Sequence, residues 1–501
     1  MLRPLPVCSF AVLLSSLAAQ VPYGFGTANV AGVVPRLDAS PHWIGNGAVT
    51  YRLDRAAPSA LGGLFVSTAH AATTLGGSSV LIDLLPGRLL FSAPLLLNAS
   101  GTAQFAMAIP PGATGLIGLR LFLQAAVADT PIAGALLASS NGIEVEVTAP
   151  PMLFVGNPYG SPSPFALLDP SSLNTLSQSV LPAGAVANGA TVIDGGRELL
   201  VASPTTLAIE RGDLTVSPPT WTRLQTFTAP PFGLVSAPRQ RLLFTLVGPQ
   251  YGIKDLVALD GDPTSPSYGL EVGRLPAISD VVSDDGWDVA VAGDRLAIHH
   301  GGLGTDLLLV DIDPARTTFL QIVDSSPIPG LMPQFNGVRA IRSSADGTIV
   351  FVVLGVGFFT VPSGIHRYRT DTRQWLDHNP GLAGIQAIGP RSTPPGPMIT
   401  SSDFALARDE SFAVVMNYDK LVRLDFDRDD PDYWQLTNLT GSWVPTTGPS
   451  HVLTANGDLV LLVGNSPLPG TTAYLIDPFT ANISGLQAIV PSATNATFGR
   501  R

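Results

Sequence analysis

A polar turn separates two apolar runs in the segment Val192-Ile193-Asp194-Gly195-Gly196-Arg197-Glu198-Leu199-Leu200-Val201. Gly and Asp adopt the backbone conformations of tight turns, and apolar runs rich in β-branched residues form strands, so this segment predicts a β-hairpin. The same order of apolar run, polar turn and apolar run recurs at 281–291, 341–353, 404–416 and 452–463. Repeated hairpins therefore dominate the second half of the chain.

A second kind of strand, which ends in an acidic residue and is often followed by Pro, accompanies these hairpins. Its copies end at or near Asp169, Glu210, Asp260, Asp311, Asp371, Asp425 and Asp477. They lie about 40 to 60 residues apart, which is the length of a four-stranded propeller blade. A parallel β-helix would need a much shorter period and stacked sandwiches a longer one. We therefore expect a seven-bladed β-propeller over 151–501, with six or eight blades as alternatives because 204–231 fits poorly.

The first part of the chain has a shorter rhythm. Between residues 20 and 150, short apolar or alternating runs are split by Gly, Pro and Asn; they lie at 48–53, 63–68, 80–85, 88–97, 104–109, 116–126 and 143–147. Several short strands with frequent turns predict a β-sandwich. The prolines in Ala149-Pro150-Pro151 would end any strand ladder, so we expect the boundary between the two domains there. The expected fold class is all-β.

Composition and charge exclude several classes of protein. The 501 residues carry 27 Lys and Arg against 38 Asp and Glu, for a net charge of −11, so no basic surface is available for nucleic acid or an anionic membrane. Charged residues make up only 13% of the chain, while 51 Gly and 45 Pro indicate many turns. The sequence thus predicts a weakly acidic, turn-rich globular protein.

The first 19 residues have the three parts of a secretory signal. Arg3 gives a positive start, 10–17 is an apolar run, and Ser16-Leu17-Ala18 forms a small-x-small cleavage motif. We expect export with loss of residues 1–19, and a mature monomer that is secreted, periplasmic or at the cell surface. The one cysteine, Cys8, lies inside this signal, so the mature chain would have no disulfide and no thiolate metal site. No later apolar run reaches the about 18 residues of a transmembrane segment.

The hairpins and Asp-Pro strand ends resemble those of divergent bacterial propellers grouped as WD-repeat-like, quinoprotein-like and YVTN-type proteins. The front part, with Gly24-Phe25-Gly26, Pro35-Arg36-Leu37 and Ala108-Ile109-Pro110, looks like a small sandwich found in secreted proteins of planctomycete-type bacteria. The quinoprotein resemblance implies the fold alone, because the five tryptophans after residue 200 do not recur at one position per blade. The YVTN resemblance implies a surface or secreted binding protein.

Motifs of common enzyme classes are absent from the sequence. It contains no Gly-x-Ser-x-Gly, no His-Glu-x-x-His and no phosphate-binding loop. The densest acidic cluster includes Asp425, Asp427 and Asp429, whose alternating carboxylates could bind calcium. It lacks the glycine and the closing glutamate of a standard calcium loop, and similar Asp-Pro segments after Asp260 and Asp311 favour plain solvated turns. We expect no cofactor, with calcium as the alternative.

Two groups of histidines are interpreted as structural. The pair His299-His300 ends an apolar strand, where neighbouring side chains face opposite ways and rarely share one metal, so a surface or turn role is expected. His366 lies beside aromatic and arginine residues, which indicates a polar blade edge.

A ligand site is predicted where the first strands of the blades begin. Side chains distant in sequence meet at that mouth of a propeller channel. Counting back from the hairpin turns identifies Asp280, Asp403 and His451, with Asn336 and Arg339 one or two positions outside this register. These groups suit an anion or an oxygen-rich ligand and, if Asp280, Asp403 and His451 meet, a divalent metal.

The sequence supports two functional hypotheses. The first is an exported, non-enzymatic binding or scaffold protein that holds a protein or glycan ligand on the propeller face. The alternative is an extracellular propeller enzyme, a lyase, hydrolase or lactonase, with its site at the same channel mouth. Propellers host both kinds of site, and fold does not decide between them.

Overall fold

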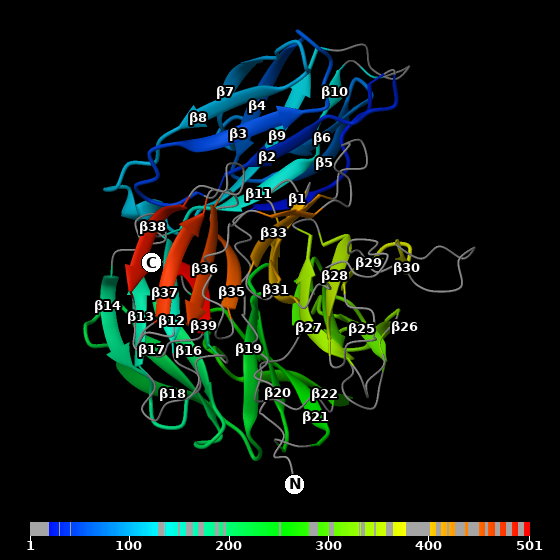
Figure 1. Cartoon of the computed structure of the whole chain (residues 1–501). Helices are drawn as coiled ribbons and strands as arrows, with labels where there is room; N and C mark the ends of the chain where they lie inside the picture. Colours follow the sequence, from blue (N-terminus) through cyan, green and yellow to red (C-terminus); the bar gives the residue numbers. More distant parts are fainter. Residues whose placement is uncertain are drawn as a thin grey trace. The chain divides into compact units, whose positions relative to one another are not determined.

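The computed structural model describes residues 20–500 apart from several segments (Figure 1). The undescribed segments are 30, 41, 129–134, 136, 149–150, 157–163, 169–174, 186–189, 194–196, 250–251, 280–288, 300–304, 330, 332–335, 345–346, 357–363, 377–400, 407–411, 418–419, 426–435, 439–449, 456–458, 466–470, 477–482 and 489–494. For strands after residue 400, only the backbone is described.

The chain divides into two compact units, Leu17–Pro151 and Met152–Arg500. Strands form nearly all of the regular structure in both. The exception among the described residues is a single 3-10 turn at Thr114–Leu116. No helix in the described part has the length and apolar character needed to cross a bilayer.

The first unit contains three sheets. The six-stranded sheet comprises β1 (Gln20–Tyr23), β11 (Gly142–Glu146), β9 (Arg120–Val127), β4 (Leu61–Ser67) and β7 (Leu89–Leu96) in that order, with β10 (Ala138–Ser139) also paired to β9. The three-stranded sheet comprises β2 (Arg36–Ala39), β3 (Val49–Asp54) and β8 (Ala103–Met107). A separate hairpin comprises β5 (His70–Leu75) and β6 (Ser78–Ile82).

One hydrophobic core lies between the six-stranded and three-stranded sheets. Alternate residues of β3 enter it, including Tyr51, and so do Leu64 of β4 and Leu123 of β9. The intervening residues of β3, such as Arg52, lie on the outer face. This alternation is the pattern of a sheet with one face on the core and one in solvent.

The described residues of the second unit form seven four-stranded sheets. In sheet order they are β39 (Asn495–Arg500), β12 (Pro151–Gly156), β13 (Pro164–Leu168), β14 (Thr175–Val180); β15 (Ala190–Ile193), β16 (Glu198–Ser203), β17 (Ala208–Asp213), β18 (Thr220–Thr226); β19 (Pro231–Ala237), β20 (Leu242–Val247), β21 (Lys254–Asp260), β22 (Glu271–Ser279); β23 (Val289–Ala292), β24 (Arg295–His299), β25 (Asp306–Asp311), β26 (Ile322–Pro327); β27 (Asn336–Ser343), β28 (Ile349–Val356), β29 (Gly364–Arg369), β30 (Gln374–Trp375); β31 (Ser401–Leu406), β32 (Phe412–Asn417), β33 (Lys420–Asp425), β34 (Leu436–Asn438); and β35 (Ser450–Ala455), β36 (Leu459–Asn465), β37 (Thr471–Ile476), β38 (Ile483–Ala488).

We call the first strand in each of these sheets its inner strand, namely β39, β15, β19, β23, β27, β31 and β35. Consecutive inner strands contact one another from β15 to β35, and β39 contacts both β35 and β15. The strand from the end of the chain thus joins the sheet that begins the unit. The end at which the inner strands begin is called the entry end below.

One predicted hairpin is displaced along the sequence. The run 289–291 was expected to be the second strand of its hairpin, but it belongs to the inner strand β23, which pairs with β24 across the turn Gly293-Asp294. Gly293 has a positive φ of 63°, as a two-residue hairpin turn requires. The sequence has a turn signal on each side of this strand, Asp285-Gly286 before it and Gly293-Asp294 after it. The first of these lies outside the described residues.

Candidate functional site

Three of the predicted ligand residues lie near the starts of neighbouring inner strands. Asn336 is the first residue of β27, Asp403 the third of β31 and His451 the second of β35. β27 contacts β31, which contacts β35 (Figure 1). The backbone therefore brings an amide, a carboxyl and an imidazole residue to the entry end of three adjacent sheets. Their side chains lie outside the described part of the structure.

Two of the inner strands carry β-bulges at predicted ligand residues. In β27 the pairing passes from Val338–Leu354 to Ala340–Val353, so Arg339 is an extra residue. In β31 the pairing passes from Ser401–Asn417 to Phe404–Val415, so Asp403 lies in a segment with one extra residue. Bulges redirect side chains and are enriched beside active sites.

The fifth predicted ligand residue is not placed by the structure. Asp280 lies outside the described residues, directly after the last residue of β22. It was identified by counting back from a turn at 284–286, whereas the hairpin of its sheet turns at Gly293-Asp294. The described hairpin gives no support to the register used for Asp280, which stays a prediction.

A buried lysine at the entry end was missed by the sequence analysis. Lys254, the first residue of β21, is fully buried. Its ammonium donates a hydrogen bond of 3.0 Å to the carbonyl of Gly252 and lies 5.6 Å from the centre of the Phe232 ring, within cation–π range. A lysine at the start of an apolar strand gives no sequence signal of burial, because packing against the rest of the sheet determines it.

Phe232 itself adjoins a third bulge. β19 has one extra residue between Phe232 and Val235. The buried Thr245 hydroxyl donates to the carbonyl of Gly233 at 2.8 Å within this bulge. Side-chain hydrogen bonds thus support the irregular backbone at the entry end of this sheet.

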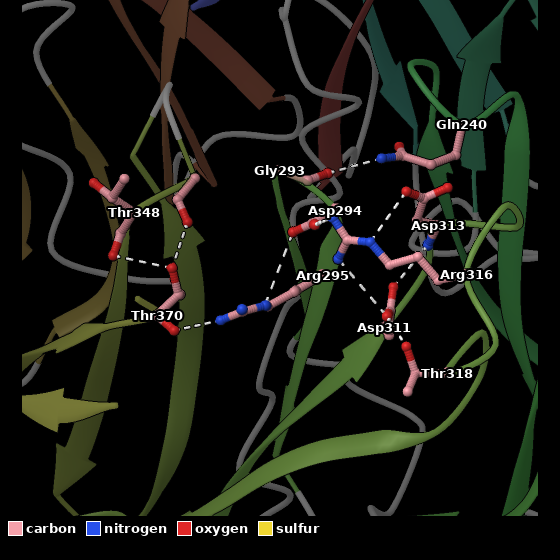
Figure 2. Close-up of polar contacts among 11 residues, drawn as sticks. Gln240, Gly293, Asp294, Arg295, Asp311, Asp313, Arg316, Thr318, Thr348 and Thr370 are labelled. Carbon is pink, nitrogen blue, oxygen red and sulfur yellow. Dashed lines mark hydrogen bonds and ion pairs between the residues drawn. The ribbon is translucent and has the colours of Figure 1, made fainter. Parts of the chain in front are cut away.

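The Asp-Pro segments at the ends of the third strands form closed turns rather than open cation loops. Asp311 is only 3% exposed; its carboxylate accepts a 3.0 Å hydrogen bond from the amide of Asp313 and another from the Thr318 hydroxyl (Figure 2). Arg316 adds ion pairs to Asp294, Asp311 and Asp313. The protein's own donors therefore occupy these oxygens, and Asp311 is buried rather than solvated as expected.

The turn after β21 repeats this construction. The Asp260 carboxylate accepts hydrogen bonds from the amide of Asp262 at 2.9 Å and from the Ser267 hydroxyl at 2.6 Å. Desolvation raises the pKa of Asp260, but hydrogen bonding to Ser265, Ser267 and the amide of Asp262 together hold this pKa below its ordinary value. Spacings of two and seven residues from the first Asp are the same as in the turn after β25. Both turns are therefore one recurring structural element.

Polar contacts at the opposite end of the inner strands join neighbouring sheets (Figure 2). The side-chain amide of Gln240 donates to the carbonyl of Gly293 at 3.0 Å, and Arg295 donates to the carbonyl of Thr370. In another sheet pair, the Tyr268 hydroxyl donates to the buried Glu198 at 2.6 Å, and Arg211 also pairs with Glu198. The Arg211–Glu198 pair lies within one sheet, and the other three contacts link adjacent sheets, so we assign all these groups to structure.

The calcium candidates can be placed only in part. Asp425 is the last residue of β33, the position that Asp260 and Asp311 occupy in their sheets. Asp427 and Asp429 lie outside the described residues. Where side chains are described, no group of three or more His, Cys, Asp or Glu is arranged to hold a metal.

The position of Asp425 leads to a prediction that separates a turn from a calcium site. Asp311→Ala and Asp425→Ala are each expected to lower the free energy of unfolding by about 2 kcal/mol, because donors in the turn lose a charged acceptor. Urea unfolding with added calcium or with a chelator should give the same value for each protein. A wild-type chain that calcium stabilises strongly, beside an Asp425→Ala variant that it does not, would instead establish a calcium site.

Two histidines expected at the surface are buried. His299, the last residue of β24, is 9% exposed, and His366 in β29 is 2% exposed. The ring of His366 meets the edge of Trp375 with centres 6.1 Å apart. Burial lowers the pKa of His366 from 6.5 to about 4. The interpretation of His366 as part of a polar edge is therefore wrong: the flanking residues gave no sign of how deeply β29 is covered.

Comparison with known proteins gives similarity of fold only. No protein-family model and no curated protein matches the sequence. A functionally unknown protein from Desulfotomaculum acetoxidans shares 12% identity, with a TM-score of 0.48 over 70% of this chain and 99% of that chain. The periplasmic gluconolactonase PpgL of Pseudomonas aeruginosa shares 17%, with a TM-score of 0.46 over 70% and 99% of the two chains.

A third similar structure is the β-propeller domain of Cps50 (Swd1) from Myceliophteria thermophila, at 13% identity and a TM-score of 0.40 over 62% of this chain and 88% of that domain. The similar folds thus include β-propellers. At such low identities and TM-scores, no ligand or activity is transferred to this chain.

Proposed function

We propose that the protein is an exported binding protein with two domains, a β-sandwich over 20–150 and a seven-bladed β-propeller over 151–501. Its ligand would lie at the entry end of the inner strands, held by Asn336, Arg339, Asp403 and His451. Residues 1–19 would direct export. Seven four-stranded sheets with inner strands in continuous contact support the propeller, and the core shared by two sheets supports the sandwich.

The coincidence of bulges with chosen residues is the observation that carries this proposal. The hairpin pattern of the sequence alone marks Arg339 and Asp403 as polar positions near the starts of inner strands. Both lie in bulged segments of strands that contact each other. A bulge interrupts the hydrogen bonding between two strands. Bulges at two polar residues on adjacent strands therefore favour a functional role over the alternative that these residues are polar only because strand ends are exposed to solvent.

The residue types favour an oxygen-rich ligand such as a glycan. A guanidinium and an amide donate hydrogen bonds, a carboxylate accepts them from hydroxyls, and an imidazole can do either. A sugar presents hydroxyls and ring oxygens that use both kinds of partner.

The test is direct binding to oligosaccharides. The wild-type protein is screened on an array of neutral and acidic oligosaccharides, and the best ligand is titrated by calorimetry into Asp403→Ala and His451→Ala. Each variant is expected to bind at least about tenfold more weakly, because a buried hydrogen bond at the ligand is lost. Asp371→Ala and His70→Ala, at exposed positions away from the inner strands, serve as matched controls. Unchanged affinity in Asp403→Ala and His451→Ala would refute the proposed site.

The enzymatic alternative uses the same residues. A carboxyl and an imidazole residue on contacting strands are the types that act as general acid and base. Turnover of a sugar lactone or oligosaccharide by the wild-type chain, lost in both Asp403→Ala and His451→Ala, would favour a hydrolase or lactonase over a binding protein.

A further inference from the structure

The outer face of the three-stranded sheet in the first unit is unusually charged for this protein. In β2 and β3 the residues that alternate with the core are Arg36, Asp38, Thr50, Arg52 and Asp54, four of which are charged. Arg55 follows directly, in a left-handed conformation with φ of 59°. Three of the five arginines between residues 20 and 151 thus lie on these two short strands or directly after one of them, in a chain with only 13% charged residues.

Strand pairing brings these charges together. Arg36 lies opposite Asp54, and Asp38 lies opposite Arg52, which in turn faces Gln104 of β8 on its other side. Opposed residues of an antiparallel pair have Cβ atoms about 5 Å apart. The face therefore presents guanidinium, carboxyl and amide groups in a compact array.

The arginines of this array influence Asp54 through their charge but form no close ion pair among the described residues. None of Arg36, Arg52 and Arg55 forms an ion pair in the structure as described, whereas Arg120 in the same unit pairs with Glu144 at 3.2 Å. If these charges served only to stabilise the sheet, Arg36 would form an ion pair with Asp54 and Arg52 would form one with Asp38. Arg36, Arg52 and Arg55 act on Asp54 through their charge but form no direct ion pair among the described residues, so their guanidinium groups are available to a ligand.

The carboxyl of Asp54 is a second feature of this face that favours a ligand. Its Oδ1 atom is buried and has no hydrogen-bond donor in the structure. Burial raises the pKa of Asp54, and the charges of Arg36, Arg52 and Arg55 only partly oppose this rise. A buried carboxyl oxygen without a donor costs about 1–3 kcal/mol, so the second oxygen of this carboxyl is the one open to a ligand.

We propose that this face of β2, β3 and β8 is a binding site for an anionic carbohydrate. The guanidinium groups of Arg36, Arg52 and Arg55 would hold its carboxylate or sulfate groups, since the planar fork of arginine matches both. Asp54 would accept a hydrogen bond from a neighbouring sugar hydroxyl. The site is separate from the proposed propeller site and does not depend on it.

The experiment uses the full chain and three soluble polymers of similar length. Oligogalacturonate carries carboxylates, sulfated dextran carries sulfates, and plain dextran is neutral. Binding is measured by calorimetry for the wild-type protein and for Arg36→Gln and Arg52→Gln. Arg88→Gln is the matched control, because Arg88 lies in the same unit, is exposed and is outside the array. Arg339→Gln reports on binding at the propeller.

We expect at least one anionic polymer to bind and plain dextran not to bind. Arg36→Gln and Arg52→Gln should each weaken binding about tenfold, as for loss of one charge-assisted contact, while Arg88→Gln has no effect. The preferred polymer identifies the anionic group. Absence of binding to both anionic polymers would overturn the proposal, as would equal weakening by Arg88→Gln, or loss of binding in Arg339→Gln alone.

Discussion

Removal of residues 495–501 is expected to unfold the second unit at temperatures where the intact chain is stable. These residues contain β39, which completes the sheet of β12, β13 and β14 and contacts the inner strands β15 and β35. Without it, the backbone groups along one edge of β12 lose their partners, and two inner strands lose a neighbour. With about 1 kcal/mol for each lost backbone hydrogen bond, the cost of a six-residue strand is on the order of 5 kcal/mol.

A loss of that size equals the whole stability of many domains, so a melting temperature at least about 10 °C lower, or no folded second unit at all, is expected. Circular dichroism and calorimetry measure it. A chain that lacks only Arg501 is the control, because this residue lies beyond β39. A synthetic peptide of residues 489–501 should restore the transition when added in trans. A truncated chain that melts like the full one would show that β39 does not hold the unit together.

Much of the strand order of this fold is predictable because it depends on short-range chemistry. The strands that end in acidic residues were all located, and the structure shows why: Asp260 and Asp311 accept hydrogen bonds from residues two and seven positions later. Such a turn needs Asp at a fixed place whatever packs above it. The signal therefore survives in the sequence of these two repeats.

The hairpin of β19 and β20 was missed because its turn lacks the usual glycine. The turn residue with positive φ is Arg241, at 54°, and it follows Pro238-Arg239-Gln240. A bulky residue in this region is uncommon and gives no turn signal. Gln240 instead contributes an inter-sheet hydrogen bond to Gly293, which only the assembled unit reveals.

The sequence predicts which positions could form the ligand site, but it does not predict the backbone irregularities at those positions. Polar residues at the starts of Asn336–Ser343, Ser401–Leu406 and Ser450–Ala455 follow from the hairpin pattern. The bulges at Arg339 and Asp403 depend on how each inner strand pairs with its neighbour, and one extra residue leaves no mark on the alternation of such short apolar strands.

The buried His366 determines how acid affects the second unit. Its side chain is buried beside Trp375, and desolvation lowers its pKa from 6.5 to about 4. The folded state therefore favours the neutral ring, whereas the unfolded chain binds a proton at higher pH. Because the folded pKa lies below the unfolded one, this contribution to stability is complete above pH 6.5 and decreases as the pH falls towards 4.

The size of the effect follows from the shift. One pKa unit corresponds to about 1.4 kcal/mol, so the free energy of unfolding should fall by on the order of 3 kcal/mol between pH 6.5 and pH 4 through this residue alone. Other groups also titrate in acid, and comparison with His366→Leu separates them, since leucine retains the burial and cannot be protonated. Urea unfolding at a series of pH values should therefore give a shallower acid dependence for His366→Leu than for the wild type, with His70→Leu, altered at an exposed position, following the wild type. Parallel curves for the wild type and His366→Leu would mean that the ring remains accessible to protons in the folded state.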